Sequence, residues 1–238
     1  MAKMPGRVFG LGVGPGDPEL LTLKALRLLR AAPVVAYLAP GQGHSFARSI
    51  VAAWLEDRQR EIAIRIPMRP GAPPATIYDA AAAELATELD HGNDVALLCQ
   101  GDPSFYGSFV HLFVRLTGRY RIEIVPGVPS TAACAAAAST PLVTRDETLA
   151  VIPATLGEAE IARRLGESDS MAIVKLGRHF PKVRQILREL GLHDRARYIE
   201  LATLPNQHVS PLACVDAARV PYFSMILIRR RGLIEENG

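Results

Sequence analysis

The sequence is short of the residues that mark disulfide-rich and metal-binding proteins. Its three cysteines, Cys99, Cys134 and Cys214, lie far apart with no paired spacing. An odd, scattered set argues against a disulfide framework and against a zinc site. The six histidines are also scattered, without a pair at helical spacing. Because no secretory signal is recognised, we expect a reducing, cytoplasmic environment and no protein-bound metal.

Charge of one sign and long apolar runs are scarce too. The net charge is only +3 at pH 7, which is too small to indicate a nucleic-acid or membrane partner. No apolar run approaches the roughly 20 residues that span a bilayer. Short basic clusters such as Arg229–Arg231 are typical of a solvated face. With 49% hydrophobic and 21% charged residues, the composition is that of a soluble globular protein with one large or two small domains.

The most informative stretch begins at Val8, where an apolar segment of strand type runs into a turn. Glycine occupies every second position of that turn from Gly10 to Gly16. Glycine permits left-handed dihedrals and the close approach of a ligand or of another backbone. Asp17 is predicted to cap a helix that starts at Pro18 and carries apolar residues from Leu20 to Leu29. A tight strand-to-helix connection without a ligand remains an alternative.

Two nucleotide-binding motifs do not fit this turn. A dinucleotide fingerprint that starts at Gly12 needs a small residue where Asp17 stands, and one that starts at Gly10 needs it where Pro15 stands. No glycine is followed at the phosphate-loop spacing by Gly-Lys-Ser/Thr. The turn therefore indicates a corner shaped for a different ligand.

Strand and helix patterns alternate along the chain, which predicts an α/β fold with a layered parallel sheet in its first half. We expect a first domain over residues 1–125 and a second over 126–238, joined at the Pro-Gly loop after Val125. Ser45 is expected to cap the second helix. The predicted strands are 34–38, 62–66, 95–99, 122–125, 149–153, 171–176, 198–203 and 222–228. The predicted helices are 46–55, 78–89, 109–116, 132–138, 158–165 and 180–190.

A second turn, Gly101-Asp102-Pro103, follows the predicted strand 95–99 and resembles the first corner. Ligands of open α/β sheets bind beyond the carboxyl ends of the strands, so we expect both corners to face one site. Asp102 could instead cap the next helix. Lys175 interrupts an apolar strand, so it either emerges at the strand end or meets an anion, and an ordinary surface lysine is equally compatible.

Four ordered motifs resemble the tetrapyrrole methylase family. They are residues 13–25, Gly101-Asp102-Pro103 with Tyr106, residues 125–128, and Glu200-Leu201-Ala202-Thr203 with Gln207. Within the family, residues 101–109, 175–182 and 221–224 are similar to precorrin-2 C-20 methyltransferases. One departure is Leu201, where family members often carry arginine, and it leaves the local ion pairing in doubt.

The resemblance implies two α/β domains with the active site in the cleft between them, and a homodimer. It implies an S-adenosylmethionine-dependent enzyme of cobalamin biosynthesis that methylates the C-20 meso carbon of precorrin-2 to give precorrin-3A. We also expect Asp102 to orient the pyrrole nitrogens or assist proton movement, and Lys175 to hold the carboxylates of the macrocycle. The cofactor-binding positions that the resemblance implies are Pro15, Gly101, Asp102, Tyr106, Ser130, Thr131, Leu176 and Ala202.

Three other functions stay open at this point. The acceptor could be the cobalt-bearing counterpart of precorrin-2, although the lack of a histidine constellation favours the metal-free substrate. Relatives of this fold methylate a modified histidine in a protein or a ribose in RNA, and the modest charge weighs against RNA. A tetrapyrrole carrier without catalysis would use a similar cleft but would lack affinity for the cofactor.

Overall fold

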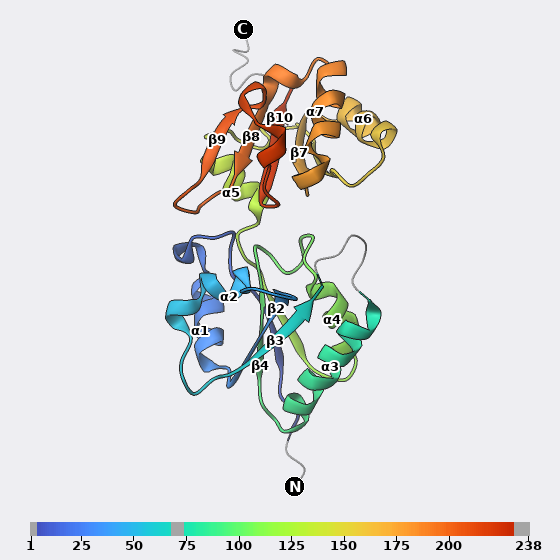
Figure 1. The fold of residues 1–238 in the computed structure, drawn as a ribbon. Coiled ribbons are helices and arrows are strands. Elements are labelled where there is room, and N and C mark those ends of the chain that lie inside the picture. The colour runs from blue at the N-terminus through green and yellow to red at the C-terminus, as the bar shows by residue number, and fades with distance from the viewer. Residues whose placement is uncertain (1–3, 68–73, 231–238) are drawn as a thin grey trace. The chain divides into compact units, whose positions relative to one another are not determined.

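The computed structural model describes residues 4–67 and 74–230 (Figure 1). The chain divides into two compact units, Met1–Pro129 and Ser130–Gly238. Each unit has its own β-sheet with helices on its faces, which confirms the predicted α/β class. Among the described helices, none combines the length and the apolar character that crossing a bilayer requires.

The first unit is built on a five-stranded parallel sheet in the order β3-β2-β4-β1-β5. Every residue of β1 and β4 is buried. Helices cover both faces of the sheet, which is why these strands are continuous apolar runs in the sequence. The strands are β1 (Val8–Gly12), β2 (Val34–Pro40), β3 (Arg60–Ile66), β4 (Val95–Cys99) and β5 (Ile122–Val125).

Two helices lie on each face of this sheet (Figure 1). Helices α1 (Leu23–Ala31) and α2 (Phe46–Ile50) share a core with Phe9 and its neighbours, while Val8 packs in the core on the other face. That other face is covered by α3 (Ala75–Asp90) and α4 (Phe109–Leu116). The Ser45 hydroxyl caps α2 by accepting from the Arg48 backbone N–H at 3.3 Å, which confirms the predicted cap.

The predicted start of the first helix is wrong. Asp17 caps only a short 3-10 turn, η1 (Pro18–Leu20), by accepting from the Glu19 backbone N–H at 2.8 Å. The chain is then extended at Leu21, and α1 begins at Leu23. Thr22 is its cap, because its hydroxyl accepts from the Ala25 N–H at 3.2 Å. Leu23 is consequently 85% exposed rather than part of the apolar side.

The second unit has a mixed five-stranded sheet in the order β6-β7-β10-β8-β9. Strands β6 and β7 pair in parallel, and the other neighbours in this sheet pair antiparallel. Helices α6 (Glu158–Glu167) and α7 (Phe180–Glu189) cover one face, and α5 (Ser130–Ala137) covers the other (Figure 1). The strands are β6 (Leu149–Pro153), β7 (Ser170–Val174), β8 (Ala196–Glu200), β9 (His208–Pro211) and β10 (Ser224–Arg229).

Two strands of this unit end earlier than the sequence predicts, and β9 was not predicted at all. Strand β7 stops before Lys175 and β8 stops before Leu201, because both residues adopt left-handed backbone dihedrals with φ of 59° and 52°. Such dihedrals cannot continue a strand. The unit also contains the short 3-10 turns η3 (Gly177–His179), η4 (His193–Arg195), η5 (Leu212–Cys214) and η6 (Ala217–Arg219), and the first unit contains η2 (Ala52–Trp54).

Candidate functional site

In the first unit, the loops after β1 and β4 are joined directly to each other. Gly14 and Gly101 form an antiparallel bridge in which the Gly101 N–H donates to the Gly14 carbonyl at 2.7 Å and the Gly14 N–H donates to the Gly101 carbonyl at 3.3 Å. Both glycines have left-handed φ, 81° and 67°. Pro15 is buried immediately after this bridge. The two predicted corners therefore lie side by side at the carboxyl ends of their strands.

A third loop, which follows β5, packs against the same bridge. A Cβ on Gly127 would lie 2.2 Å from the Gly101 carbonyl oxygen and 2.8 Å from the Gly12 Cα. A Cβ on Gly12 would lie 2.4 Å from the Gly127 nitrogen. Because these separations are far below any real carbon contact, the three backbones can meet only where Gly12 and Gly127 are both glycine.

The Asp102 carboxylate ties this junction together. One oxygen accepts from the Ser104 backbone N–H at 2.8 Å, and the other accepts from the Gly127 N–H at 2.9 Å. Asp102 therefore does not cap α4, which begins at Phe109 without any side-chain cap. A carboxylate held by two backbone donors has a fixed orientation and still has lone pairs to accept from a ligand.

Two further groups near this junction have a defined character. Tyr106 has a left-handed φ of 55°, is 49% exposed, and meets Phe105 edge to face with ring centroids 5.1 Å apart. Its ring therefore lies half-exposed at the surface of the loop. Burial, and then the charge on Asp102, raise the pKa of the Cys99 thiol. Cys99 remains a neutral packing residue rather than a nucleophile.

The site residues predicted in the second unit range from exposed to completely buried. Ser130, the first residue of α5, is exposed, whereas Thr131 is 5% exposed. Lys175 is exposed at the end of β7, so it emerges at the strand end as one of the two predicted possibilities. Leu176 is completely buried in the core beneath α6 and α7. Only the backbone of Leu176 could therefore contact a ligand without rearrangement of the core.

Ala202 lies in a compact loop between β8 and β9. It stands between Leu201 and Thr203, whose φ values of 52° and 71° are both left-handed. The Leu201 N–H donates to the Phe223 carbonyl at 2.9 Å, and the Gln207 side-chain oxygen accepts from the Thr203 N–H at 2.8 Å. The motif of residues 200–203 with Gln207 thus forms one loop that the Gln207–Thr203 hydrogen bond closes.

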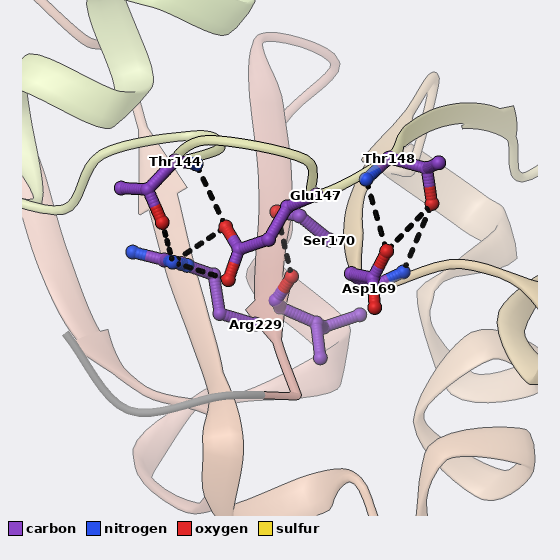
Figure 2. Close-up of polar contacts among 7 residues, drawn as sticks. Thr144, Glu147, Thr148, Asp169, Ser170 and Arg229 are labelled. Carbon is purple, nitrogen blue, oxygen red and sulfur yellow. Dashed lines mark hydrogen bonds and ion pairs between the residues drawn. The ribbon is translucent and has the colours of Figure 1, made fainter. Parts of the chain in front are cut away.

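The interpretation of Arg229 as part of a solvated basic cluster is wrong, because Arg229 forms a buried ion pair in the second unit (Figure 2). Arg229 of β10 bonds both carboxylate oxygens of Glu147, at 2.8 and 2.6 Å, and both side chains are 7% exposed. The Thr144 N–H donates to Glu147 at 2.8 Å. The hydrogen bond from Arg229 lowers the pKa of Glu147 most, and the bond from the Thr144 N–H lowers it further. The Thr-x-x-Glu spacing, typical of a capping box, was the available signal for the local part.

Beside it, the Asp169 carboxylate accepts from both the backbone N–H and the hydroxyl of Thr148, each at 2.9 Å (Figure 2). The Ser170 hydroxyl donates to the Ile228 carbonyl at 3.2 Å. The Thr148–Asp169 bonds attach the end of the connection between α5 and β6 to the residue that precedes β7, and the Ser170–Ile228 bond joins β7 to β10. They stabilise the scaffold and do not involve any predicted site residue.

The second unit also contains a hollow of about 350 Å³ beside β8 and β9. Tyr198, Glu200 and Asp216 are among its lining residues, and the Tyr198 hydroxyl donates to the Glu200 carboxylate at 2.6 Å. Burial, and then this bond, raise the pKa of Tyr198. None of the residues expected to bind the cofactor lines this hollow. In the described part of the chain, no group of three or more His, Cys, Asp or Glu side chains is placed to hold a metal ion.

Comparisons with known proteins give consistent matches. A family model described as Tetrapyrrole (Corrin/Porphyrin) Methylases matches residues 7–213. The chain is 44% identical over 241 residues to the cobalamin biosynthesis protein CobIJ of Mycobacterium tuberculosis, covering 96% of this chain and 47% of that protein. The chain thus spans about half the length of this relative.

Two other matches cover nearly the whole of both chains. The precorrin-2 C(20)-methyltransferase of a Sinorhizobium species is 40% identical over 232 residues, which are 94% of this chain and 95% of that one. The uroporphyrin-III C-methyltransferase of Thermus thermophilus, solved in complex with S-adenosyl homocysteine, superposes with a TM-score of 0.69 at 26% identity. That superposition covers 93% of this chain and 97% of the other.

Proposed function

Because this chain belongs to the tetrapyrrole (corrin/porphyrin) methylase family, we propose that it transfers a methyl group from S-adenosylmethionine to the C-20 meso carbon of precorrin-2, giving precorrin-3A. The observation that supports this most strongly is the end-to-end similarity to a precorrin-2 C(20)-methyltransferase. This match covers 94% of this chain and 95% of that relative, so it supports C-20 as the acceptor carbon more strongly than a match to one part of a longer protein does.

The junction of the first unit fits a cofactor that carries an ammonium group and an aromatic base. Asp102 supplies an oriented carboxylate, and Tyr106 supplies a half-exposed ring. We assign Pro15, Gly101, Asp102 and Tyr106 to the cofactor, together with Ser130, Thr131, Ala202 and the backbone of Leu176. When bound, the cofactor supplies an electrophilic methyl group on a sulfonium.

Chemistry of this kind depends on positioning more than on a strong base. The attacking carbon of an electron-rich macrocycle needs only to be held in line with the methyl group. Holding it there lowers the activation barrier, because the entropy of bringing the two groups together is lost on binding and not in the reaction step. Asp102 is suited to this task because its two backbone bonds prevent rotation of the carboxylate. It would accept from a pyrrole N–H of the macrocycle or assist the proton movement that follows methylation.

Lys175 would hold a carboxylate side chain of the substrate. Its ammonium is carried on an exposed residue whose left-handed backbone turns the chain away from β7. An exposed point charge of this kind pairs with flexible anionic groups without the fixed geometry of arginine. We propose the same general role for the few exposed basic residues near it, such as Arg178.

The decisive experiment adds precorrin-2 and S-adenosylmethionine to the purified protein and follows the absorption spectrum and the mass of the product. The gain of one methyl group with metal-free precorrin-2 supports the proposal. Faster methylation of the cobalt-bearing counterpart would show that this compound is the acceptor, and the proposed methyl transfer would stand. Calorimetry with S-adenosylmethionine separates an enzyme from a tetrapyrrole carrier, because a carrier would give no heat of binding.

The role of Asp102 is tested with Asp102→Ala and Asp102→Asn. We expect Asp102→Ala to lower kcat by at least tenfold, since both an oriented acceptor and a clamp between two loops are lost. Asp102→Asn should retain one acceptor oxygen and part of the activity. A normal kcat in Asp102→Ala, with normal cofactor affinity, would remove Asp102 from the mechanism.

For Lys175, the expected result of Lys175→Ala is a higher KM for the tetrapyrrole with a nearly unchanged kcat. Lys182, whose ammonium donates to the Leu156 carbonyl at 2.5 Å, provides a matched control on the same unit. Lys182→Ala should leave KM unchanged. An unaltered KM in Lys175→Ala would reject the proposed contact with the substrate carboxylate.

A further inference from the structure

The loop between β8 and β9 holds two residues in a conformation that their side chains disfavour. Leu201 and Thr203 have φ of 52° and 71°, and neither is glycine. Thr203 is β-branched, for which a left-handed backbone is a genuine outlier. Strain of this kind persists only where other contacts impose it, and it is concentrated at ligand-binding sites.

The loop has a compact internal hydrogen-bond pattern. The Leu204 N–H donates to the Leu201 carbonyl at 3.0 Å, and the Gln207 N–H donates to the Leu204 carbonyl at 2.9 Å. Two successive turns thereby bring the Gln207 side chain back toward the start of the loop. There its Oε1 accepts from the Thr203 N–H at 2.8 Å.

We propose that Gln207 is a positioning residue that presents Ala202 to the cofactor. This inference rests on the proposed function, because Ala202 is one of the assigned cofactor positions. Ala202 lies between the two left-handed residues, so the directions of its N–H and carbonyl are set by the dihedrals that the Gln207 bond stabilises. Without that acceptor, Thr203 can relax toward an extended backbone, which would rotate the peptide groups on both sides.

The location of Gln207 makes the test clean. The residue is exposed, so its replacement removes no buried apolar surface. Its neighbour Asn206 is an exposed amide in the same loop, and no hydrogen bond joins its side chain to the described residues. Asn206→Ala is therefore a matched control for the loss of an exposed amide at this place.

The experiment measures the Kd of S-adenosyl homocysteine by calorimetry for the wild-type chain and for Gln207→Ala, Gln207→Glu and Asn206→Ala. We expect about a tenfold weaker Kd for Gln207→Ala, which corresponds to about 1.4 kcal/mol. Gln207→Glu retains an acceptor oxygen and should remain within threefold of wild type. Asn206→Ala should bind as the wild type does, and all four proteins should have similar Tm values.

A second measurement follows the hydrogen exchange of the Thr203 amide in the ligand-free protein. Exchange should be faster in Gln207→Ala and restored in Gln207→Glu. Faster exchange with an unchanged Kd would overturn the inference, since the bond would then be structural only. If the wild-type chain itself does not bind, the proposed function fails and this inference fails with it, whereas normal binding by Gln207→Ala overturns the inference alone.

Discussion

The two units place left-handed backbone at the ends of their strands by different means. In the first unit, the residues at the junction of the loops are glycines, Gly14 and Gly101, with φ of 81° and 67°. In the second, the corresponding positions are Lys175, Leu201 and Thr203, with φ between 52° and 71°. At the bridge between its loops the first unit thus avoids steric strain, although Tyr106, further along the loop after β4, has φ of 55°. The second unit places strained residues directly after its strands.

The reason for the difference is the crowding of backbones. Three loops meet in the first unit so closely that a Cβ at Gly12 or Gly127 would overlap a neighbouring backbone. In the second unit, the left-handed residues Lys175, Leu201 and Thr203 lie at exposed or half-buried places, where a side chain can reach solvent. Glycine is therefore required where backbones cross, and a left-handed residue with a side chain is tolerated where neighbouring backbones do not crowd it.

The largest expected effect is that of Gly127→Ala. The methyl group would overlap the Gly101 carbonyl, so we expect a loss of roughly 3 kcal/mol in the free energy of unfolding. At Gly166, in the exposed part of α6, an added methyl group would have nothing within 4 Å. Gly166→Ala should raise the free energy of unfolding by about 0.5–1 kcal/mol, because glycine inside a helix is less favourable than alanine. Urea unfolding measures both, and a stable Gly127→Ala protein would refute the crowding argument.

The next effect concerns ion pairs. Arg229 lowers the pKa of Glu147 below its usual 4.5, so the pair contributes stability above pH 4.5 and loses it as the pH falls through the lowered value. The difference in stability between wild type and Glu147→Gln should therefore be full at pH 7 and should vanish in strong acid. Urea midpoints across this range measure it.

The first unit offers the comparison for this pair. Arg48 and Glu61 are 2.6 Å apart, but their side chains are 38% and 31% exposed. Salt screens exposed charges far more than buried ones. Hence 0.5 M salt, about three times the physiological ionic strength, should remove most of the effect of Glu61→Gln and little of that of Glu147→Gln. Equal sensitivity to salt would contradict the distinction.

A smaller effect is expected when glycine and a residue with a side chain are exchanged at the left-handed positions Gly14 and Lys175. Gly14→Ala should lower the free energy of unfolding by about 1–2 kcal/mol. The added Cβ would make only ordinary contacts, but an alanine at this position would have to keep the left-handed backbone. Lys175→Gly should be more stable than Lys175→Ala by roughly 0.5–1 kcal/mol, which is the relief of strain less the entropy of glycine in the unfolded chain. If Lys175→Gly were the less stable, the strain at this position would be absent in solution.

The smallest effect is chemical. Burial raises the pKa of Cys134 to about 12 and raises that of Cys99 further. Cys214 is exposed. A thiol reagent at pH 8 should therefore titrate one cysteine rapidly in the native protein and three in urea. Rapid reaction of Cys99 would show that the strand beneath the first-unit junction opens readily.

Much of the architecture could be predicted from the sequence. Strand β4 was predicted with its observed bounds, and the prediction of a parallel sheet in the first unit is confirmed, because continuous apolar runs are a local record of burial on both faces. The start of α1 was predicted wrongly, since both Asp17 and Thr22 are good caps and only the extended backbone at Leu21 decides between them.

The sequence by itself determined the order of the strands and helices other than β9, the glycine corners and the motifs that indicate the family. These follow from periodicity and from the backbone preferences of single residues, which act locally. Only the tertiary structure decided that Asp102 bonds Gly127, that Arg229 pairs with Glu147 and that Leu201 and Thr203 turn left-handed. Each of these depends on partners far along the chain or on strain that surrounding contacts must impose, and such causes leave no mark in the local sequence.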